Sequence, residues 1–273
     1  MPLAFPALDP PAEAERARRW LRKSPASSRA VHEARKSLKR ARAFLKLGRG
    51  TEVEAWSGRA EEACRRAARA LASLRDSRVF AAALDDLLER EAGDLPRSAR
   101  VRGRALVLRA RRDEASALAR GAALARARSA LRAFPGEPAP GRFARTVAAS
   151  LEDGLRRSYR RGRRAYRAAR SSPRRGRCHD LRKASKRLLH ELEGLSPGPR
   201  GRRGAAITSL RRLTRILGDE HDMALLRGRL PDDGALAALR RLARRRQRRL
   251  RRRALVVAKG LFWDKRPAGM LGT

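Results

Sequence analysis

Several features that mark common protein classes are scarce or missing in this sequence. It has no asparagine and only two cysteines, Cys64 and Cys178, which lie far apart and outside any CxxC motif. A disulfide framework or a cysteine-based zinc site is therefore not expected. Apolar runs such as residues 254–258 are far shorter than the roughly 18 residues of a membrane span. The first residues also lack the basic and apolar regions of a secretory signal, so we expect a cytoplasmic protein.

Acidic residues are scarce relative to basic ones. The 69 lysines and arginines outweigh 28 aspartates and glutamates, which gives a formal net charge of +41 at pH 7. Because a compact fold with this charge repels itself, the composition favours a polyanionic partner. Arginine outnumbers lysine 61 to 8, a bias that GC-rich coding would also produce, so the few lysines are the more informative positions. Hydrophobic residues make up 42% of the chain, which argues against a disordered basic tail.

Strand signals are almost absent, because β-branched residues are few and alternating patterns are short. Helical periodicity runs along nearly the whole chain, and a capping box at residues 51–54 marks one helix start. Breaks are expected at 48–50, 93–96, 135–141 and 196–199, where glycine and proline gather. We predict an all-α fold with helices at about 11–23, 28–47, 52–75, 77–92, 97–133, 142–170, 174–194, 200–217, 219–229 and 233–262.

The segment 135–141 is the strongest candidate for a domain boundary. It contains three prolines and two glycines near the middle of the chain. Residues 1–134 carry 31 basic and 16 acidic residues, whereas residues 135–273 carry 38 and 12, so the second half is the more basic. We predict that 135–141 links a first half, 1–134, to a second half, 142–273.

A motif of the first half recurs in the second half. VHEARKSLKR at 31–40 aligns with CHDLRKASKR at 178–187, an offset of 147 residues. A second pair follows at an offset of 146, in which Arg75-Asp76 aligns with His221-Asp222. Two motifs in the same order at nearly one offset indicate that the chain is a duplicated helical unit.

Each copy of the first motif is strongly amphipathic on a helix. At about 100° per residue, apolar side chains take one side, and a wedge about as wide holds basic ones. Surface helices usually mix acids into such a face, but here there are almost none. A solvated charged face is the alternative to an anion site, but it does not explain why four of the eight lysines hold equivalent positions. The basic wedge contains His32, Arg35, Lys36, Lys39 and Lys46 in the first copy, and His179, Arg182, Lys183, Lys186 and His190 in the second.

The histidines of the repeated motifs have three possible roles. His179-Asp180 and His221-Asp222 superficially resemble the HD dipeptide of metal-dependent phosphohydrolases, but the neighbouring cations disfavour a divalent metal. His221 could instead be buried and oriented by the adjacent aspartate. For His32 and His179 we favour a third role, in which the imidazole donates an N–H to an anion.

Motifs for catalysis and for cofactor binding are missing as well. The sequence has no P-loop, GxSxG or GxGxxG motif, and no carboxylate pair in surroundings suited to acid–base chemistry. An enzyme acting on phosphoanhydrides would need a cluster of carboxylates, and Asp76 and Asp222 are the only repeated candidates. We therefore expect no enzymatic activity, no metal and no cofactor.

The two copies of the motif, with the pairs at 75–76 and 221–222, resemble the CHAD family (conserved histidine α-helical domain). GLRRSYRRGRRA at 154–165 is similar to the family's helix that opens the second half, and LFWDKRP at 261–267 is similar to its closing segment. The resemblance covers about residues 12–268 and implies two helical bundles related by a pseudo-twofold axis. It further implies a basic channel between them that binds inorganic polyphosphate, and a stand-alone module without a triphosphate-tunnel domain.

The resemblance also implies which residues bind polyphosphate. Its motif positions correspond here to His32, Arg35, Lys36, Lys39, Arg40, His179, Arg182, Lys183, Lys186 and Arg187. Four residues of the second half are expected to line the same channel: Tyr159, Arg160, Arg163 and Arg164. His221 and its counterpart Arg75 belong to the motif either as ligands or as structural residues.

The expected function is to sequester polyphosphate, or to localise the protein or its partners to polyphosphate granules. A general polyanion-binding or nucleic-acid-binding protein is the alternative, because it would share the charge and the salt dependence. With only 11 aromatic residues, few side chains are left for stacking on bases, which disfavours this alternative.

Overall fold

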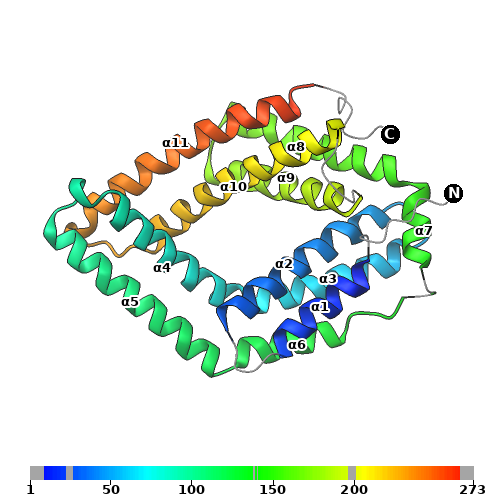
Figure 1. Cartoon of the computed structure of the whole chain (residues 1–273), viewed down its shortest axis with the longest axis horizontal. Coiled ribbons are helices and arrows are strands. Elements are labelled where there is room, and N and C mark those ends of the chain that lie inside the picture. The colour runs from blue at the N-terminus through cyan, green and yellow to red at the C-terminus, as the bar shows by residue number, and fades with distance from the viewer. Residues whose placement is uncertain (1–8, 23–26, 138, 140, 196–200, 265–273) are drawn as a thin grey trace.

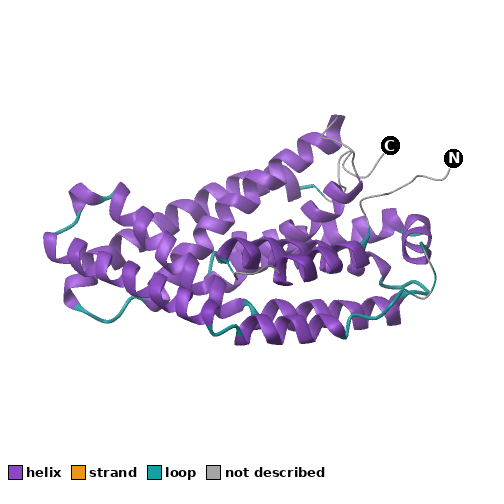
Figure 2. Ribbon diagram, turned by 60° about the horizontal axis from the view of Figure 1, so that its bottom comes forward, coloured by secondary structure: helices purple, strands orange, loops and turns teal. Residues whose placement is uncertain are grey.

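The computed structural model describes residues 9–22, 27–137, 139, 141–195 and 201–264. Within these residues the chain is helical and contains no strand, which confirms the all-α prediction (Figure 2). The α-helices are α1 Pro10–Arg22, α2 Ser28–Leu45, α3 Glu54–Ala70, α4 Ala72–Arg90, α5 Arg97–Ala119, α6 Ala122–Arg132, α7 Arg142–Ala149, α8 Leu151–Ser171, α9 Arg175–Leu195, α10 Gly201–Arg229 and α11 Ala237–Phe262. Three short 3-10 turns join them: η1 Lys46–Gly48, η2 Ala92–Asp94 and η3 Gly234–Leu236.

Several helix boundaries differ from the prediction. The expected helix 97–133 is divided at Gly121, which has a left-handed φ of 65°, into α5 and α6. The expected helix 142–170 is divided at Ser150 into α7 and α8. The two expected helices 200–217 and 219–229 form one continuous helix, α10, because the cost of a glycine at 218, about 1 kcal/mol, is small beside the packing along the helix. The predicted break at 196–199 and the closing segment beyond residue 264 lie outside the described residues.

The helices of the first half lie along the lower side of Figure 1 and those of the second half along the upper side. Within the halves, α1 packs on α2, α3 on α6, α8 on α9 and α10 on α11. Of the contacts that cross between the halves, the two most extensive join α2 with α9 and α4 with α10. These four helices carry the repeated motifs, so the fold brings the two copies together. The division at 135–141 and the pseudo-twofold axis stay predictions.

The amphipathic pattern of the two motif helices is confirmed. On α2 the apolar side, Val31, Ala34, Leu38, Ala41 and Leu45, is buried. On α9 the corresponding buried residues are Leu181, Leu188 and Leu192. Since each helix buries this face, its basic wedge is turned toward the neighbouring helices and the space between them.

Helices α8 and α11 approach closely at Gly162. The ring of Phe262 lies so near that a Cβ atom added at Gly162 would be 2.5 Å from it. The same ring packs on Tyr159, with a centroid distance of 5.7 Å. Tyr159 is 2% exposed, and its hydroxyl donates a hydrogen bond of 3.1 Å to the carbonyl of Asp264. Glycine at 162 is therefore required for this contact.

Replacing Gly162 with alanine should destabilise the fold by roughly 1–3 kcal/mol, because the new methyl group overlaps the Phe262 ring. Urea unfolding followed by circular dichroism measures this change. Gly58→Ala is the matched control, since nothing lies within 4 Å of a Cβ atom there and alanine favours the helix by about 1 kcal/mol. Equal midpoints for the two variants would contradict the close packing.

Candidate anion-binding site

A pocket of about 710 Å³ lies where α2 and α4 meet α9 and α10. Both copies of the first motif contribute to it, α2 from the first half and α9 from the second. Apolar side chains such as Val31, Leu74 and Leu189 form part of its wall. Its cationic or imidazole side chains are His32, Arg35, Lys36, Lys39, Arg40, Arg75, Arg78, Arg182, Lys186 and His190. Most of the two basic wedges predicted from the sequence therefore face one shared space, whereas Lys46, His179 and Lys183 do not line it.

Five cations that line this pocket have no acidic partner in the described structure. Arg78 is exposed and Arg35 donates to the carbonyl of Ala68 at 2.5 Å, which leaves Lys39, Arg182 and Lys186 as half-buried cations without a strong partner. Within the described part of the chain, no carboxylate oxygen lies within 4.0 Å of the charged nitrogens of Lys39, Arg182 or Lys186. The Nε atom of Arg182 is buried and has no hydrogen-bond partner in the structure. These three side chains come from both halves, one from α2 and two from α9. An anion entering the pocket would be the first strong partner for each of them.

Lysines at neighbouring positions of the same helices are paired. Lys36 lies 3.6 Å from the carboxylate of Glu33, one turn earlier on α2. Lys183 lies 2.7 Å from the carboxylate of Asp180 on α9. Lys183 is also 58% exposed and does not line the pocket. Lys36 lines the pocket as well, so the lack of an acidic partner distinguishes Lys39 and Lys186 from the other two lysines of these helices.

Burial and mutual repulsion lower the pKa values of the two pocket lysines. Desolvation, followed by the nearby charge of Lys186, lowers the pKa of Lys39 to about 6. Desolvation, followed by the charge of Arg182, lowers the pKa of Lys186 to about 8. The free pocket therefore sheds part of its charge at neutral pH, and an anion would restore it.

Arg75 joins the two halves beside the pocket. Its guanidinium donates to Asp76 Oδ1 at 3.0 Å and to Asp222 Oδ1, on α10, at 3.3 Å. Burial raises the pKa of the Asp222 carboxyl group, despite the nearby positive charge of Arg75. Arg75 thus has the structural role considered for this position, and it lines the pocket as well.

The three motif histidines are placed differently. His32 lines the pocket, its side chain is 68% exposed, and desolvation lowers its pKa. His179 and His221 do not line the pocket and lie together, with ring centroids 5.0 Å apart. Desolvation and then the charge of Arg182 lower the pKa of His221 to about 4. The described residues contain no group of three or more His, Cys, Asp or Glu side chains suited to a metal ion.

The chain matches the model of a known protein family over most of its length. The family model described as CHAD domain matches residues 12–231 of the 273. The chain belongs to the CHAD family. A search of curated proteins found no match. Among the helices that the structure describes, none is long and apolar enough to cross a membrane.

Two further residues of the CHAD motif point away from the pocket. Lys183 is exposed, as described above, and Arg187 donates to the buried Glu191 at 2.7 Å. Arg187 also reaches the carbonyl of Lys46 at 3.5 Å, which ties α9 to the end of α2. On α9, Arg182 and Lys186 share the pocket face, and each next residue is rotated by about 100° away from it.

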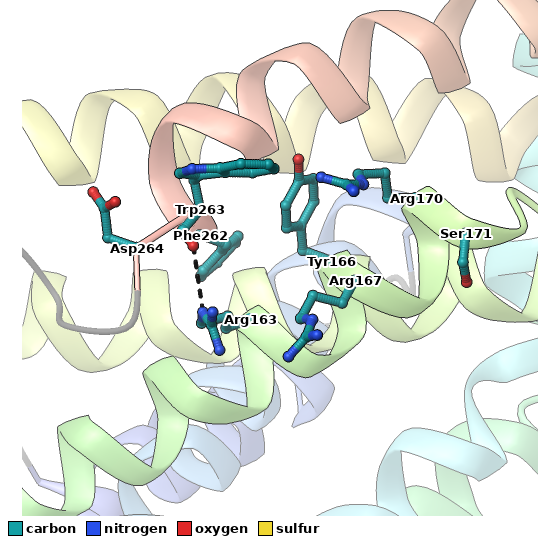
Figure 3. Close-up of a pocket in the computed structure, with 8 residues that line it drawn as sticks. All are labelled: Arg163, Tyr166, Arg167, Arg170, Ser171, Phe262, Trp263 and Asp264. Carbon is teal, nitrogen blue, oxygen red and sulfur yellow. Dashed lines mark hydrogen bonds between the residues drawn. The ribbon is translucent and has the colours of Figure 1, made fainter.

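The Tyr- and Arg-rich helix of this CHAD domain does not line the pocket, contrary to expectation. Helix α8 packs on α9 and α11, so its side chains do not reach the space between α2 and α4. Tyr159 is part of the core, whereas Arg160 and Arg164 are exposed. Arg163 lines a separate pocket of about 600 Å³ beside Trp263, where its Nε donates to the Trp263 carbonyl at 3.4 Å (Figure 3).

Several pocket residues were missed by the sequence analysis. Arg78 lies one helical turn after Arg75, so the helical period of the second motif could have identified it. Glu114 from α5 and Glu193 from α9 also line the pocket. No sequence signal marks these two acids, because only the packing of α5 and α9 brings them to the pocket.

Replacing Lys39 with methionine should stabilise the ligand-free protein near neutral pH, because it removes a half-buried amine that has no acidic partner and is held away from its ordinary charged form. The folded pKa of about 6 lies below that of an unfolded lysine, about 10.4, so the unfolded chain binds more protons between these values. Wild-type stability should therefore rise with pH in that window, and the advantage of Lys39→Met should shrink.

Urea unfolding at several pH values measures this effect. Lys183→Met is the control, since an exposed, paired lysine should change stability by no more than about 0.5 kcal/mol. A Lys39→Met variant less stable than the Lys183→Met variant at neutral pH would contradict the analysis.

Proposed function

We propose that this CHAD protein binds inorganic polyphosphate in the pocket between α2, α4, α9 and α10. The observation that carries the proposal is the set of three half-buried cations without acidic partners in the described structure, Lys39, Arg182 and Lys186, supplied by both halves. Holding like charges together costs stability in the free protein, and a chain of phosphates would offset that cost.

Inorganic polyphosphate suits this pocket chemically. It is a thin, flexible chain with a negative charge at every phosphate and no bases to be recognised. Ammonium and guanidinium groups bind its non-bridging oxygens without requiring one register. The residues that line the pocket include no Phe, Tyr or Trp, so the stacking on which single-stranded nucleic acids depend would be missing.

The same reasoning supports a binding module without catalytic activity. The carboxylates around the pocket are few, and Asp222 is already engaged by Arg75 at 3.3 Å. A role in sequestering polyphosphate in the cytoplasm, or in localising to polyphosphate granules, follows from binding alone. A general affinity for polyanions, including nucleic acids, is the competing function.

Replacing the two pocket lysines that have no acidic partner should weaken polyphosphate binding more than replacing two lysines outside the pocket. Lys39→Gln/Lys186→Gln takes two cations from the pocket, whereas Lys183→Gln/Lys259→Gln removes the same charge outside it. Labelled polyphosphate is competed with unlabelled polyphosphate, duplex DNA and single-stranded DNA at about 150 mM salt. We expect at least a tenfold loss, about 1.4 kcal/mol, for the pocket variant and less than about threefold for the control.

Equal losses in the two double variants, or equal competition by DNA and polyphosphate, would refute the pocket and leave general polyanion binding. Circular dichroism and the unfolding midpoint of each variant show whether it is folded.

Binding should also take up protons. An anion beside Lys39 and Lys186 favours their charged forms, so it raises pKa values that are about 6 and about 8 in the free protein. Affinity should therefore increase as pH falls from about 9 to 6.5, by up to about tenfold per pH unit for each proton taken up. Calorimetry in two buffers of different ionisation enthalpy counts these protons, and Lys39→Gln should take up fewer. A proton count of zero in the wild-type protein would exclude the coupling.

A further inference from the structure

Lys39 is partly buried, lies near several cations and has no acidic partner in the described structure. Its side chain is only partly exposed and opens into the pocket, and no carboxylate lies within 4.0 Å of its amine in the described structure. Cations face it from three of the helices that form the pocket: Arg35 on α2, Arg75 on α4, and Arg182 and Lys186 on α9. The carboxylates that line the same pocket are already engaged: Asp222 on α10 by Arg75, Glu193 on α9 by His190 and Arg211, and Glu114 on α5 by Ser28.

These surroundings favour the neutral amine. Burial and the adjacent cations lower the pKa of Lys39 to about 6, whereas an ordinary lysine has a pKa of about 10.4 and is roughly 0.1% neutral near pH 7.5. Only the neutral form has a free lone pair and is nucleophilic. The pocket therefore holds a nucleophile and, beside it, guanidinium groups that bind phosphate.

We propose that Lys39 is a modification site at which small acyl phosphates, such as acetyl phosphate, acylate the amine without an enzyme. The proposal combines the open pocket of about 710 Å³, the unpaired amine and the guanidinium groups of Arg75 and Arg182 beside it. It rests on the proposed function in one respect, since the phosphate end of the reagent would use the same cations as polyphosphate.

The reaction is balanced with the acyl phosphate as the only co-reactant. The lone pair of Lys39 Nζ attacks the carbonyl carbon, and a C–N bond forms. The C–O bond to the phosphate breaks, and inorganic phosphate leaves with the bonding electron pair. The nitrogen loses one proton to water, which leaves a neutral amide. The arginines would stabilise the charge that develops on the departing phosphate.

Acylation would change what the pocket can bind. The amide cannot regain a proton when an anion arrives, so the pocket would lose one cation permanently. Polyphosphate in the pocket would in turn cover the amine and exclude the reagent. The acylation state of Lys39 and the occupancy of the pocket would thus oppose each other.

Other lysines serve as internal controls. Lys36 and Lys183 are exposed and lie beside Glu33 and Asp180. Lys186 has no acidic partner either. With a pKa of about 8 it is more often protonated than Lys39, but it is more basic when neutral, and the two effects offset each other. We therefore expect Lys39 and Lys186 to react at similar rates, and both faster than the paired lysines.

The test treats the full-length protein with acetyl phosphate near pH 7.5 and follows acetylation of each lysine by quantitative peptide mass spectrometry. We expect Lys39 to be modified about tenfold faster than Lys36 or Lys183, because its larger neutral fraction is partly offset by its lower basicity. Acetic anhydride, which has no phosphate, should give a smaller preference. Medium-chain polyphosphate should protect Lys39 and not Lys183.

Two comparisons test the origin of the preference. Lys186→Gln removes a repelling charge and should raise the pKa of Lys39, so the pH at which its acetylation rate reaches half of the maximum should move upward from about 6. The wild-type protein offers a test without substitution: the ratio of the Lys39 and Lys183 rates should fall toward one as pH approaches about 10, where ordinary lysines also become neutral.

Acetylation of Lys39 no faster than that of Lys36 and Lys183 by acetyl phosphate would overturn the proposal, whether or not the protein binds polyphosphate. The competition titration on unmodified protein measures polyphosphate binding separately. Failure of that titration with fast acetylation of Lys39 would reject the proposed function and leave the modification site standing.

Discussion

Repulsion between the half-buried cations of the pocket is the physical constraint on which this structure depends. The packing of α2 against α9 brings the basic wedge of one half opposite that of the other, with Lys39, Arg182 and Lys186 in one pocket. Desolvation strengthens every charge interaction there, including the unfavourable ones. The fold must therefore offset the repulsion elsewhere, and the free pocket retains a strong tendency to acquire negative charge.

Two buried acids of the chain are engaged away from the pocket. Glu191 is fully buried and accepts from Arg187 of the same helix at 2.7 Å, and Glu220 of α10, also buried, accepts from Gln247 and Arg251 of α11 at 2.7 Å each. Arg187 and Arg251 pair the charge of these acids inside the structure, where an unpaired ion would be costly. Because the acids are engaged in this way, few are left to neutralise the pocket.

Three events would reduce the repulsion between the cations of the pocket. A lysine can lose its proton, an anion can bind, or the amine can be converted to an amide. Each removes repulsion, but only anion binding keeps all the cations. The competition between these outcomes would make polyphosphate binding sensitive to pH and to reactive acyl phosphates.

The sequence by itself determined the helical class, the buried and basic faces of α2 and α9, and the family, because helical period and a repeated motif are local or linear patterns. It also identified Lys39, Arg182 and Lys186 as parts of the basic wedges. Only the tertiary structure separated them from Lys183 and Arg187, since one residue along a helix turns a side chain by about 100° and decides what it faces. Likewise, Tyr159 lies outside the pocket because α8 packs on α9 and α11. Glu114 and Asp222 line the pocket because helices that are distant in the sequence meet there.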